Sequence, residues 1–200
     1  MPIEIDILTE SLSQHPLFQE SLRLVRQNAD GGRVWAIGGM VYRTIVQGLY
    51  GVEFSACDFD FIVENQKPFA DIELPAGWDL GKTPLYSPRF VNGPWQIDAV
   101  PIWNIRRPSS PSYFSSMTPD EKVIHYCELV PLTVQAIAYD LENRVLIGDT
   151  ALAAIHSRTV GVQSIEDLIE SARFTGITPR EYLEKKAKSL GFTPDYANVL

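Results

Sequence analysis

The chain has 200 residues, of which 45% are hydrophobic and 21% are charged, so it is long enough to build one sizeable hydrophobic core. Its formal net charge is -8 at pH 7. Proteins that grip a long phosphate backbone usually present a basic surface, so this charge does not favour extended nucleic acid as a partner. Cys57 and Cys127 are too few for a disulfide framework or a cysteine metal cluster, and we expect neither to be a nucleophile.

The N-terminal residues Met1-Pro2-Ile3-Glu4 lack the basic start and the apolar run of a signal peptide. No stretch approaches the roughly 18 uninterrupted apolar residues that a membrane span needs. We therefore expect a cytoplasmic protein that makes no use of a membrane.

The first part of the chain alternates predicted helices and strands. Apolar periodicity predicts a helix over residues 10–29, with His15-Pro16 able to split off its first turn. A short buried strand is predicted over 34–37, and a helix then runs from Gly39 to about residue 50. Residues 58–63 form the next predicted strand, so the local order is strand, glycine turn, helix, strand.

The middle of the chain contains a hairpin signal and a strong helix start. Residues 69–86 are rich in Pro and Gly and predict loops and short strands. Strands over 89–91 and 95–100 flank Asn92-Gly93-Pro94, where Asn and Gly tolerate the positive φ of a tight turn. Thr118 begins a helix that extends to about residue 130, with Glu121 placed to complete a capping box.

The rest of the chain becomes mainly helical. Residues 131–139 are ambiguous between helix and strand, and a turn over 140–143 precedes a strand-like stretch. Helices are predicted over 150–156, 165–174 and 182–190. The fold class is therefore α+β, with a small mixed β-sheet, flanking helices and a helical C-terminal tail. We divide the chain into a domain over 1–160 and a helical extension over 161–200.

Gly38-Gly39 stands where the first strand meets the following helix. A backbone without Cβ lets a phosphate group approach closely, and a helix N-terminus offers unpaired N–H groups and a positive dipole. On that helix, Arg43 is a candidate phosphate contact. These residues are our candidate nucleotide-binding positions.

Three aspartates on predicted strands form a candidate metal site. Asp58 and Asp60 lie two residues apart, and side chains at that spacing share one face of a strand. Asp98 lies mid-strand among apolar residues, where a carboxylate is costly to bury without a cation or hydrogen-bond donors. If the two strands are neighbours, all three carboxylates can bind Mg²⁺, or Mn²⁺, and serve as catalytic ligands in transfer from a nucleoside triphosphate.

The order of Ala36-Ile37-Gly38-Gly39, Asp58-Phe59-Asp60-Phe61 and Ile97-Asp98-Ala99 resembles the DNA polymerase beta-like nucleotidyltransferase superfamily. More specifically, residues 38–43 resemble the Gly-Gly-x-Val-Arg-Asp start of the head domain of CCA-adding tRNA nucleotidyltransferases and bacterial poly(A) polymerases. Residues 133–139 with 146–149 are similar to a second motif of those enzymes. The resemblance covers about residues 34–160 and implies a nucleotidyltransferase head that uses a divalent metal and a nucleoside triphosphate.

The chain also departs from that pattern. The Arg-Arg-Asp expected before Thr133 falls on Leu129-Val130-Pro131, and Tyr42-Arg43 replaces Arg-Asp. The resemblance therefore implies the fold and the metal triad, but not CCA addition, and it leaves the acceptor and the base preference open. A catalytically degenerate module that binds nucleotide or a partner is the main alternative, and a dehalogenase-like phosphatase and a sugar-nucleotide glycosyltransferase are further ones.

Overall fold

The computed structural model describes residues 2–54, 58–83, 86–106 and 111–199, without the side chains of residues 111 and 112. The prediction for Cys57 lies outside the described residues. No described helix has both the length and the apolar character needed to cross a membrane.

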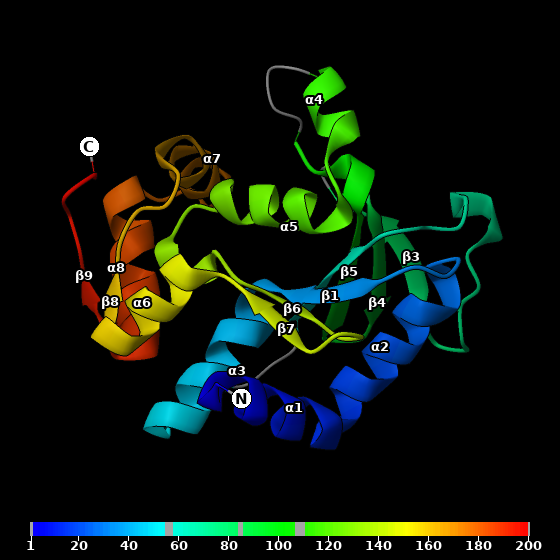
Figure 1. Cartoon of the computed structure of the whole chain (residues 1–200), viewed down its shortest axis with the longest axis horizontal. Coiled ribbons are helices and arrows are strands. Elements are labelled where there is room, and N and C mark those ends of the chain that lie inside the picture. Colours follow the sequence, from blue (N-terminus) through cyan, green and yellow to red (C-terminus); the bar gives the residue numbers. More distant parts are fainter. Residues whose placement is uncertain (1, 55–57, 84–85, 107–110, 200) are drawn as a thin grey trace.

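A mixed β-sheet forms the centre of the protein (Figure 1). In the described residues it has seven strands in the order β3-β4-β5-β2-β1-β6-β7. Strands β2 and β5 run parallel, and every other neighbouring pair in this sheet is antiparallel. The strands are β1 (Val34–Ile37), β2 (Asp58–Val63), β3 (Asp79–Lys82), β4 (Pro88–Asn92), β5 (Trp95–Pro101), β6 (Ala138–Asp140) and β7 (Val145–Ile147).

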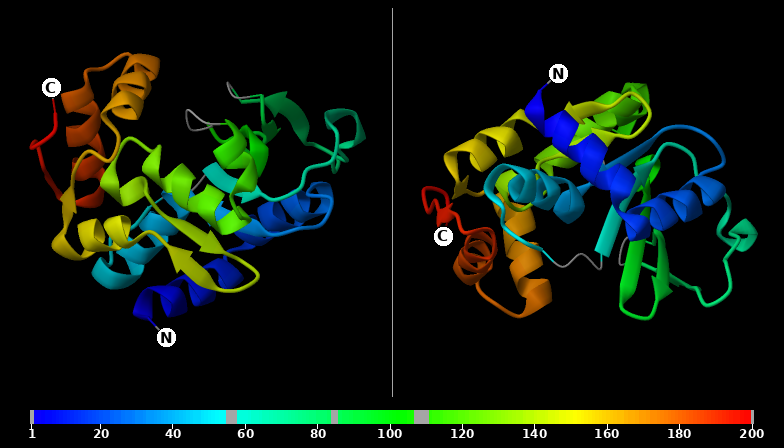
Figure 2. Two further views of the ribbon diagram at one scale, coloured as in Figure 1. Left: turned by 45° about the horizontal axis from the view of Figure 1, so that its top comes forward. Right: turned by 90° about the horizontal axis from the view of Figure 1, so that it is seen from below.

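Helices cover both faces of this sheet. Helices α1, α2 and α3 lie on one face and α5 lies on the other, while α6, α7 and α8 gather at one end, on the left in Figure 1 (see also Figure 2). The helices are α1 (Ile3–Gln14), α2 (Pro16–Asn28), α3 (Gly38–Tyr50), α4 (Pro111–Ser116), α5 (Pro119–Glu128), α6 (Asp149–Ser157), α7 (Ile165–Thr175) and α8 (Pro179–Leu190). The predicted α+β class, a mixed sheet with flanking helices, is confirmed.

The single helix predicted over residues 10–29 is wrong in its bounds. The chain forms two helices, α1 and α2, and the first of them begins at Ile3. They meet at His15, whose Nδ1 accepts a hydrogen bond of 3.2 Å from the backbone N–H of Phe18 and so caps α2. Pro16 follows at the first position of α2, where the missing N–H of proline costs no helical hydrogen bond.

The structure confirms the predicted capping box of α5 and the predicted turn between β4 and β5. Thr118 and Glu121 form the predicted capping box at the start of α5. Gly93 has φ 58° in the tight turn between β4 and β5, as the hairpin signal required. The ambiguous residues 131–139 resolve into a 3-10 turn at Thr133–Gln135 followed by the start of β6.

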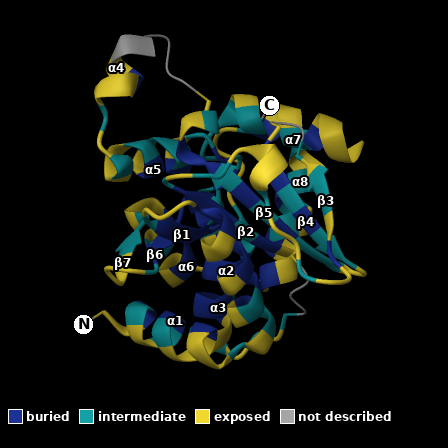
Figure 3. Ribbon diagram, turned by 90° about the vertical axis from the view of Figure 1, so that its right-hand side faces the viewer, coloured by how far each residue is buried: buried dark blue, intermediate teal, exposed yellow. Residues whose placement is uncertain are grey.

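The core lies between the sheet and its helices, where the central strands are buried (Figure 3). All four residues of β1 are buried, because β1 lies inside the sheet and is covered on both faces. In β2, Phe59, Phe61 and Val63 are buried and alternate with Asp58 and Asp60. The apolar residues thus fix the direction in which the two aspartates point.

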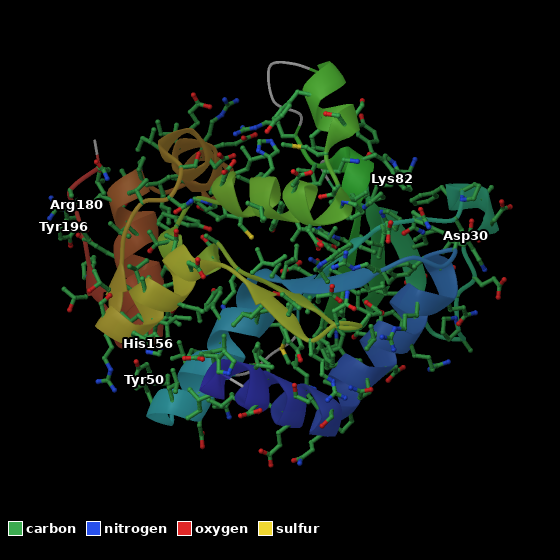
Figure 4. All side chains as sticks on the ribbon, in the orientation of Figure 1. Asp30, Tyr50, Lys82, His156, Arg180 and Tyr196 are labelled. Atoms are coloured by element: carbon green, nitrogen blue, oxygen red, sulfur yellow. The ribbon has the colours of Figure 1, made fainter. Side chains whose placement is uncertain are left out.

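The C-terminal helices are joined to the rest of the chain by several contacts. The short strands β8 (Thr159–Val160) and β9 (Thr193–Pro194) pair in parallel, so residues after α8 return to the chain before α7. At the same end of the molecule Arg180 stacks on the ring of Tyr196, with 4.8 Å from Cζ to the ring centroid (Figure 4). The division of the chain at residue 160 stays a prediction.

Candidate functional site

Asp60 and Asp98 are direct neighbours across two parallel strands. In the pairing of β2 with β5, Asp60 lies opposite Asp98 and Asp58 lies opposite Gln96. Neighbouring residues in register point to the same face of a sheet, so the carboxylates of Asp60 and Asp98 share one face. This is the strand arrangement that the sequence led us to expect for the second and third aspartates.

Asp98 is bound by an arginine from the adjacent strand. Arg89 lies opposite Asp98 in the antiparallel pairing of β4 with β5. Its Nε donates to Oδ1 of Asp98 at 2.7 Å, and one terminal nitrogen donates to Oδ2 at 2.6 Å. The Asp98 side chain is only 14% exposed. The bidentate salt bridge with Arg89 therefore supplies the cation that a buried carboxylate needs.

Asp60 has the opposite environment. The structure gives no hydrogen bond or salt bridge to the Asp60 carboxylate from any described residue. Burial, together with the nearby charges of Asp98 and Asp58, raises the pKa of Asp60 to about 7, against smaller opposing effects of Arg89 and Arg43. A carboxylate that is held among other carboxylates with few donors favours a proton or a bound cation.

Asp58 lies at the exposed start of β2. It lines a cavity of about 330 Å³ with Arg43 and with residues of α1 and α3, whereas Asp60 and Asp98 line a separate cavity of about 420 Å³. The charge of Asp58 still acts on Asp60, because it contributes to the raised pKa of that group. The three aspartates are therefore electrostatic neighbours, but they line two separate cavities.

Gly38 is the residue of the glycine pair that needs to be glycine. It has φ 63°, and a Cβ built on it would lie 3.2 Å from Oδ2 of Asp60. A Cβ on Gly39 would make ordinary contacts of at least 3.8 Å with Arg43. The first turn of α3, which has no side-chain cap, thus begins beside the unpaired carboxylate of Asp60.

Arg43 lies one turn further along α3. Its guanidinium stands 5.9 Å from the ring centroid of Tyr42 and 5.8 Å from that of Phe54. It lines the cavity that holds Asp58, and its charge lowers the pKa of Asp60 slightly. The predicted phosphate contact is therefore placed within electrostatic reach of the aspartates.

The cavity that holds Asp60 and Asp98 lies between the sheet and helices α5 and α7. Its lining includes Arg89, Arg106 and Tyr126. Burial raises the pKa of the Tyr126 hydroxyl, and the nearby charge of Asp60 adds to this effect. Tyr126 therefore stays a neutral hydroxyl at physiological pH, close to the aspartate with the raised pKa.

The donor chemistry of the aspartates fits a hard divalent cation, but the ligand set is not assembled. Within the described residues, no group of three or more His, Cys, Asp or Glu side chains is arranged to hold a metal ion. Asp60 and Asp58 offer carboxylate oxygens, the ligands that Mg²⁺ and Mn²⁺ prefer, while both oxygens of Asp98 are engaged by Arg89. Asp60 is thus the aspartate whose carboxylate oxygens have no described donor, whereas the Asp98 carboxylate already holds the Arg89 cation.

Sequence reasoning missed Arg89, although a signal for it existed. The two-residue turn at Gly93-Pro94 pairs Asn92 with Trp95, and counting back along both strands places Arg89 opposite Asp98. The predicted hairpin therefore already contained the register that makes this ion pair.

The other cysteine, Cys127, is buried, and burial raises the pKa of its thiol to about 12, which agrees with its exclusion as a nucleophile.

No family model matches the sequence, and no curated protein matches it. Solved structures do. A CCA-adding enzyme in complex with ATP is 17% identical with a TM-score of 0.62, over 95% of this chain and 41% of that one. A CCA-adding enzyme in apo form I gives the same TM-score at 16% identity, over 96% of this chain and 42% of that one.

A third structure, the Thermotoga maritima CCA-adding enzyme complexed with tRNA, is 14% identical with a TM-score of 0.55, over 90% of this chain and 46% of that one. This chain thus spans less than half the length of each of these three proteins. At such low identity the likeness concerns the fold. The protein shares its fold with part of these CCA-adding enzyme structures.

Proposed function

We propose that this protein is a metal-dependent nucleotidyltransferase that moves a nucleoside monophosphate from a nucleoside triphosphate to a hydroxyl group of an acceptor. The observation that carries the proposal is the in-register pair of Asp60 and Asp98, with Gly38 at the start of α3 against Asp60. The resemblance to structures of CCA-adding enzymes solved with ATP and with CTP supports the nucleotide part of it.

In this proposal each residue has a defined task. Asp58, Asp60 and Asp98 would hold Mg²⁺ or Mn²⁺, and Asp98 would then exchange its ion pair with Arg89 for the metal. The metal, when bound, neutralises the triphosphate and lowers the pKa of the attacking hydroxyl. The N–H groups at Gly38 and Gly39 and the side chain of Arg43 bind phosphate oxygens.

The transfer forms one bond and breaks one. The acceptor oxygen bonds to the α-phosphorus, the bond from that phosphorus to the bridging oxygen of the β-phosphate breaks, and pyrophosphate leaves. Asp98 accepts the proton of the acceptor hydroxyl. Arg89, freed from Asp98, is a cation of the same cavity that can bind the departing phosphates.

A second candidate function is a degenerate module that binds nucleotide without transferring it. Two observations favour it: the Leu129-Val130-Pro131 segment in place of Arg-Arg-Asp, and the closed ion pair of Arg89 with Asp98. The phosphatase and the glycosyltransferase have less support, because the solved structures that share the fold are CCA-adding and tRNA-processing enzymes.

Transfer can be tested with nucleoside triphosphates labelled at the α-phosphate. The protein is incubated with Mg²⁺ and with small-molecule, protein and RNA pools, and label that moves to any pool is measured. We expect transfer by the wild-type protein and a loss of about 10²-fold or more in Asp60→Asn, since the ligand that binds the metal is gone. Asp79→Asn, at an exposed position of β3, is the matched control and should keep full activity.

Calorimetry separates the two candidate functions. Binding of nucleoside triphosphate that depends on Mg²⁺, together with no transfer to any pool, would favour the degenerate module. Absence of binding in the presence and absence of Mg²⁺ would contradict both.

A further inference from the structure

A basic hollow lies between α3 and the C-terminal helices. It has a volume of about 320 Å³ and is lined by Arg43 from α3, by the end of α7 and by α8. The contributions of α8 are Tyr182, Lys185, Lys186 and Ser189. These positions follow the spacing i, i+3, i+4 and i+7, so they form one face of α8, directed at α3.

The cations of this hollow have no carboxylate partner in the part of the chain that the structure describes. Within the described residues, no salt bridge involves Arg43, Lys185 or Lys186. The acidic residues of α8 are engaged elsewhere, since Glu181 caps the helix with Thr178 and Glu184 pairs with Arg180 at 2.9 Å. The hollow thus gathers three cations in a chain of net charge -8.

The buried side chain of Tyr42 lies near two of these cations. Nζ of Lys186 donates to the hydroxyl of Tyr42 at 3.2 Å and lies 5.8 Å from the centroid of its ring. Arg43 stands 5.9 Å from the same centroid. The Tyr42 hydroxyl is neutral, so it satisfies one donor of Lys186 without neutralising its charge, and both cations stay available to an anion.

The hollow and the cavity that contains Asp58 share one lining residue, Arg43. An anion bound at Arg43 would therefore lie next to the cavity of Asp58. The cavity of Asp60 and Asp98 has no lining residue in common with the hollow.

We propose that the Arg43–Lys185–Lys186 hollow is a binding site for a phosphate group of a substrate, and this inference rests on the proposed function. Arginine supplies a planar set of donors, and lysines supply point charges, which together suit the oxygens of a phosphate. The hydroxyls of Tyr182 and Ser189 add neutral donors to the lining. The phosphate belongs either to the nucleoside triphosphate or to the acceptor.

Binding of inorganic phosphate and of tripolyphosphate to the full chain tests this site. Calorimetric titration in the presence of a chelator removes any contribution of a metal. We expect both anions to bind the wild-type protein, with an affinity that falls as salt is added. Lys185→Gln and Lys186→Gln should each weaken binding by about tenfold, since each removes a charged donor.

Lys188→Gln is the matched control. Lys188 is an exposed lysine of the same helix that does not line the hollow, so its loss changes the net charge equally and should leave binding unchanged. Lys186→Gln also removes the hydrogen bond to Tyr42, whereas Lys185 is exposed and has no recorded partner in the described residues. A tenfold effect of Lys185→Gln thus cannot come from unfolding.

A titration with a nonhydrolysable nucleoside triphosphate identifies the source of the phosphate. Weaker binding of the triphosphate by Lys185→Gln assigns the site to the nucleotide. An unchanged triphosphate affinity, with weaker binding of inorganic phosphate, assigns it to the acceptor. The proposal is overturned if the wild-type protein binds neither anion, or if the Lys185, Lys186 and Lys188 variants bind them equally.

Failure of this inference can be told apart from failure of the proposed function. Asp60→Asn leaves the hollow intact, so it should bind inorganic phosphate as the wild-type protein does. If Asp60→Asn binds phosphate and the wild-type protein shows no transfer, the proposed nucleotidyltransferase activity is contradicted and the phosphate site is supported. If the wild-type protein shows transfer but binds no phosphate, the phosphate site is contradicted and the proposed activity is supported.

Discussion

Two aspartates on the strands that flank β1, Asp140 and Asp60, differ in the hydrogen-bond donors around their carboxylates. Asp140 of β6 pairs with Trp35, and Asp60 of β2 pairs with Ile37, two residues further along β1. Asp140 is fully buried, yet it accepts hydrogen bonds from Arg33, from the backbone N–H groups of Glu142 and Asn143, and from the Asn143 side chain. These donors hold its pKa below the usual value even though burial acts in the other direction.

Asp60 lies near two other negatively charged side chains, Asp58 and Asp98, which destabilise its ionised form. Its pKa rises to about 7 because it is buried beside two other carboxylates, and no described residue donates a hydrogen bond to it. The contrast teaches that a buried aspartate with a full set of donors supports the fold, whereas one without them marks a place where an outside cation can bind. The predictions below test the two halves of this contrast.

Asp140→Ala should have the largest effect on stability. It leaves Arg33 and two backbone N–H groups without their buried partner, which should lower the free energy of unfolding by about 4 kcal/mol. Asp120→Ala removes the exposed partner of the same arginine and should cost less than about 1 kcal/mol. Chemical denaturation of both variants measures the difference, and equal losses would show that burial does not set the value of this pair.

Asp60→Asn should act in the opposite direction. With a chelator at pH 8, removal of this repelled and desolvated charge should raise the free energy of unfolding by on the order of 2 kcal/mol. The same variant should lose the stabilisation that Mg²⁺ with a nucleoside triphosphate gives to the wild-type protein. A variant that is less stable than the wild type under chelator would mean that Asp60 has a structural partner.

The pH dependence of this difference has a definite sign. Between the unfolded pKa near 3.8 and the folded pKa of about 7, native Asp60 holds a proton that the unfolded chain has released. The stability contributed by protonated Asp60 is therefore present at low pH and is lost as pH rises to about 7. Asn does not titrate, so the advantage of Asp60→Asn should be small at pH 4 and full at pH 8. An advantage that does not change with pH would contradict the raised pKa.

Gly38→Ala should cost roughly 1.5 kcal/mol, since an L-residue with φ 63° is strained and the new Cβ would press on the Asp60 carboxylate. Gly39→Ala is the matched control, because its Cβ has room and alanine favours a helix more than glycine does. Thermal denaturation should show a lower midpoint only for Gly38→Ala. Equal midpoints would mean that the first glycine is not required.

Arg89→Gln should produce the smallest change, an increase of about tenfold in the affinity for Mn²⁺ without nucleotide. The substitution frees both oxygens of Asp98 to act as ligands, while glutamine can still donate one hydrogen bond. Titration followed by electron paramagnetic resonance measures free Mn²⁺ directly. Weaker binding in Arg89→Gln would show that Arg89 supports the metal site rather than competing for Asp98.

Much of this site could be predicted from the sequence because its parts are local. The alternation of Asp58, Phe59, Asp60 and Phe61 sets which residues face the core, and the Asn92-Gly93 turn sets the hairpin that carries Asp98. Capping signals such as Thr118 with Glu121 depend on residues three apart and were equally legible. The start of α1 was missed because Pro2 precedes it without a side-chain cap.

The basic hollow could not have been predicted in the same way. Tyr42 and Lys186 are 144 residues apart, and their contact depends on how α8 packs beside α3. Each lysine taken alone is typical of an exposed helix position, so no local pattern distinguishes Lys185 and Lys186 from Lys188. Only the tertiary arrangement separates residues that line the hollow from those that face solvent.

The proposed activity requires Asp60 to bind a divalent cation together with a nucleoside triphosphate. Electron paramagnetic resonance of Mn²⁺, with a nonhydrolysable nucleoside triphosphate, tests it directly on the wild-type protein and on Asp60→Asn. Spectra corrected for Mn²⁺ bound by the nucleotide alone should show protein-bound Mn²⁺ for the wild type and a loss of at least about tenfold in affinity for Asp60→Asn. Equal binding by the two proteins, or none by the wild type, would contradict the claim.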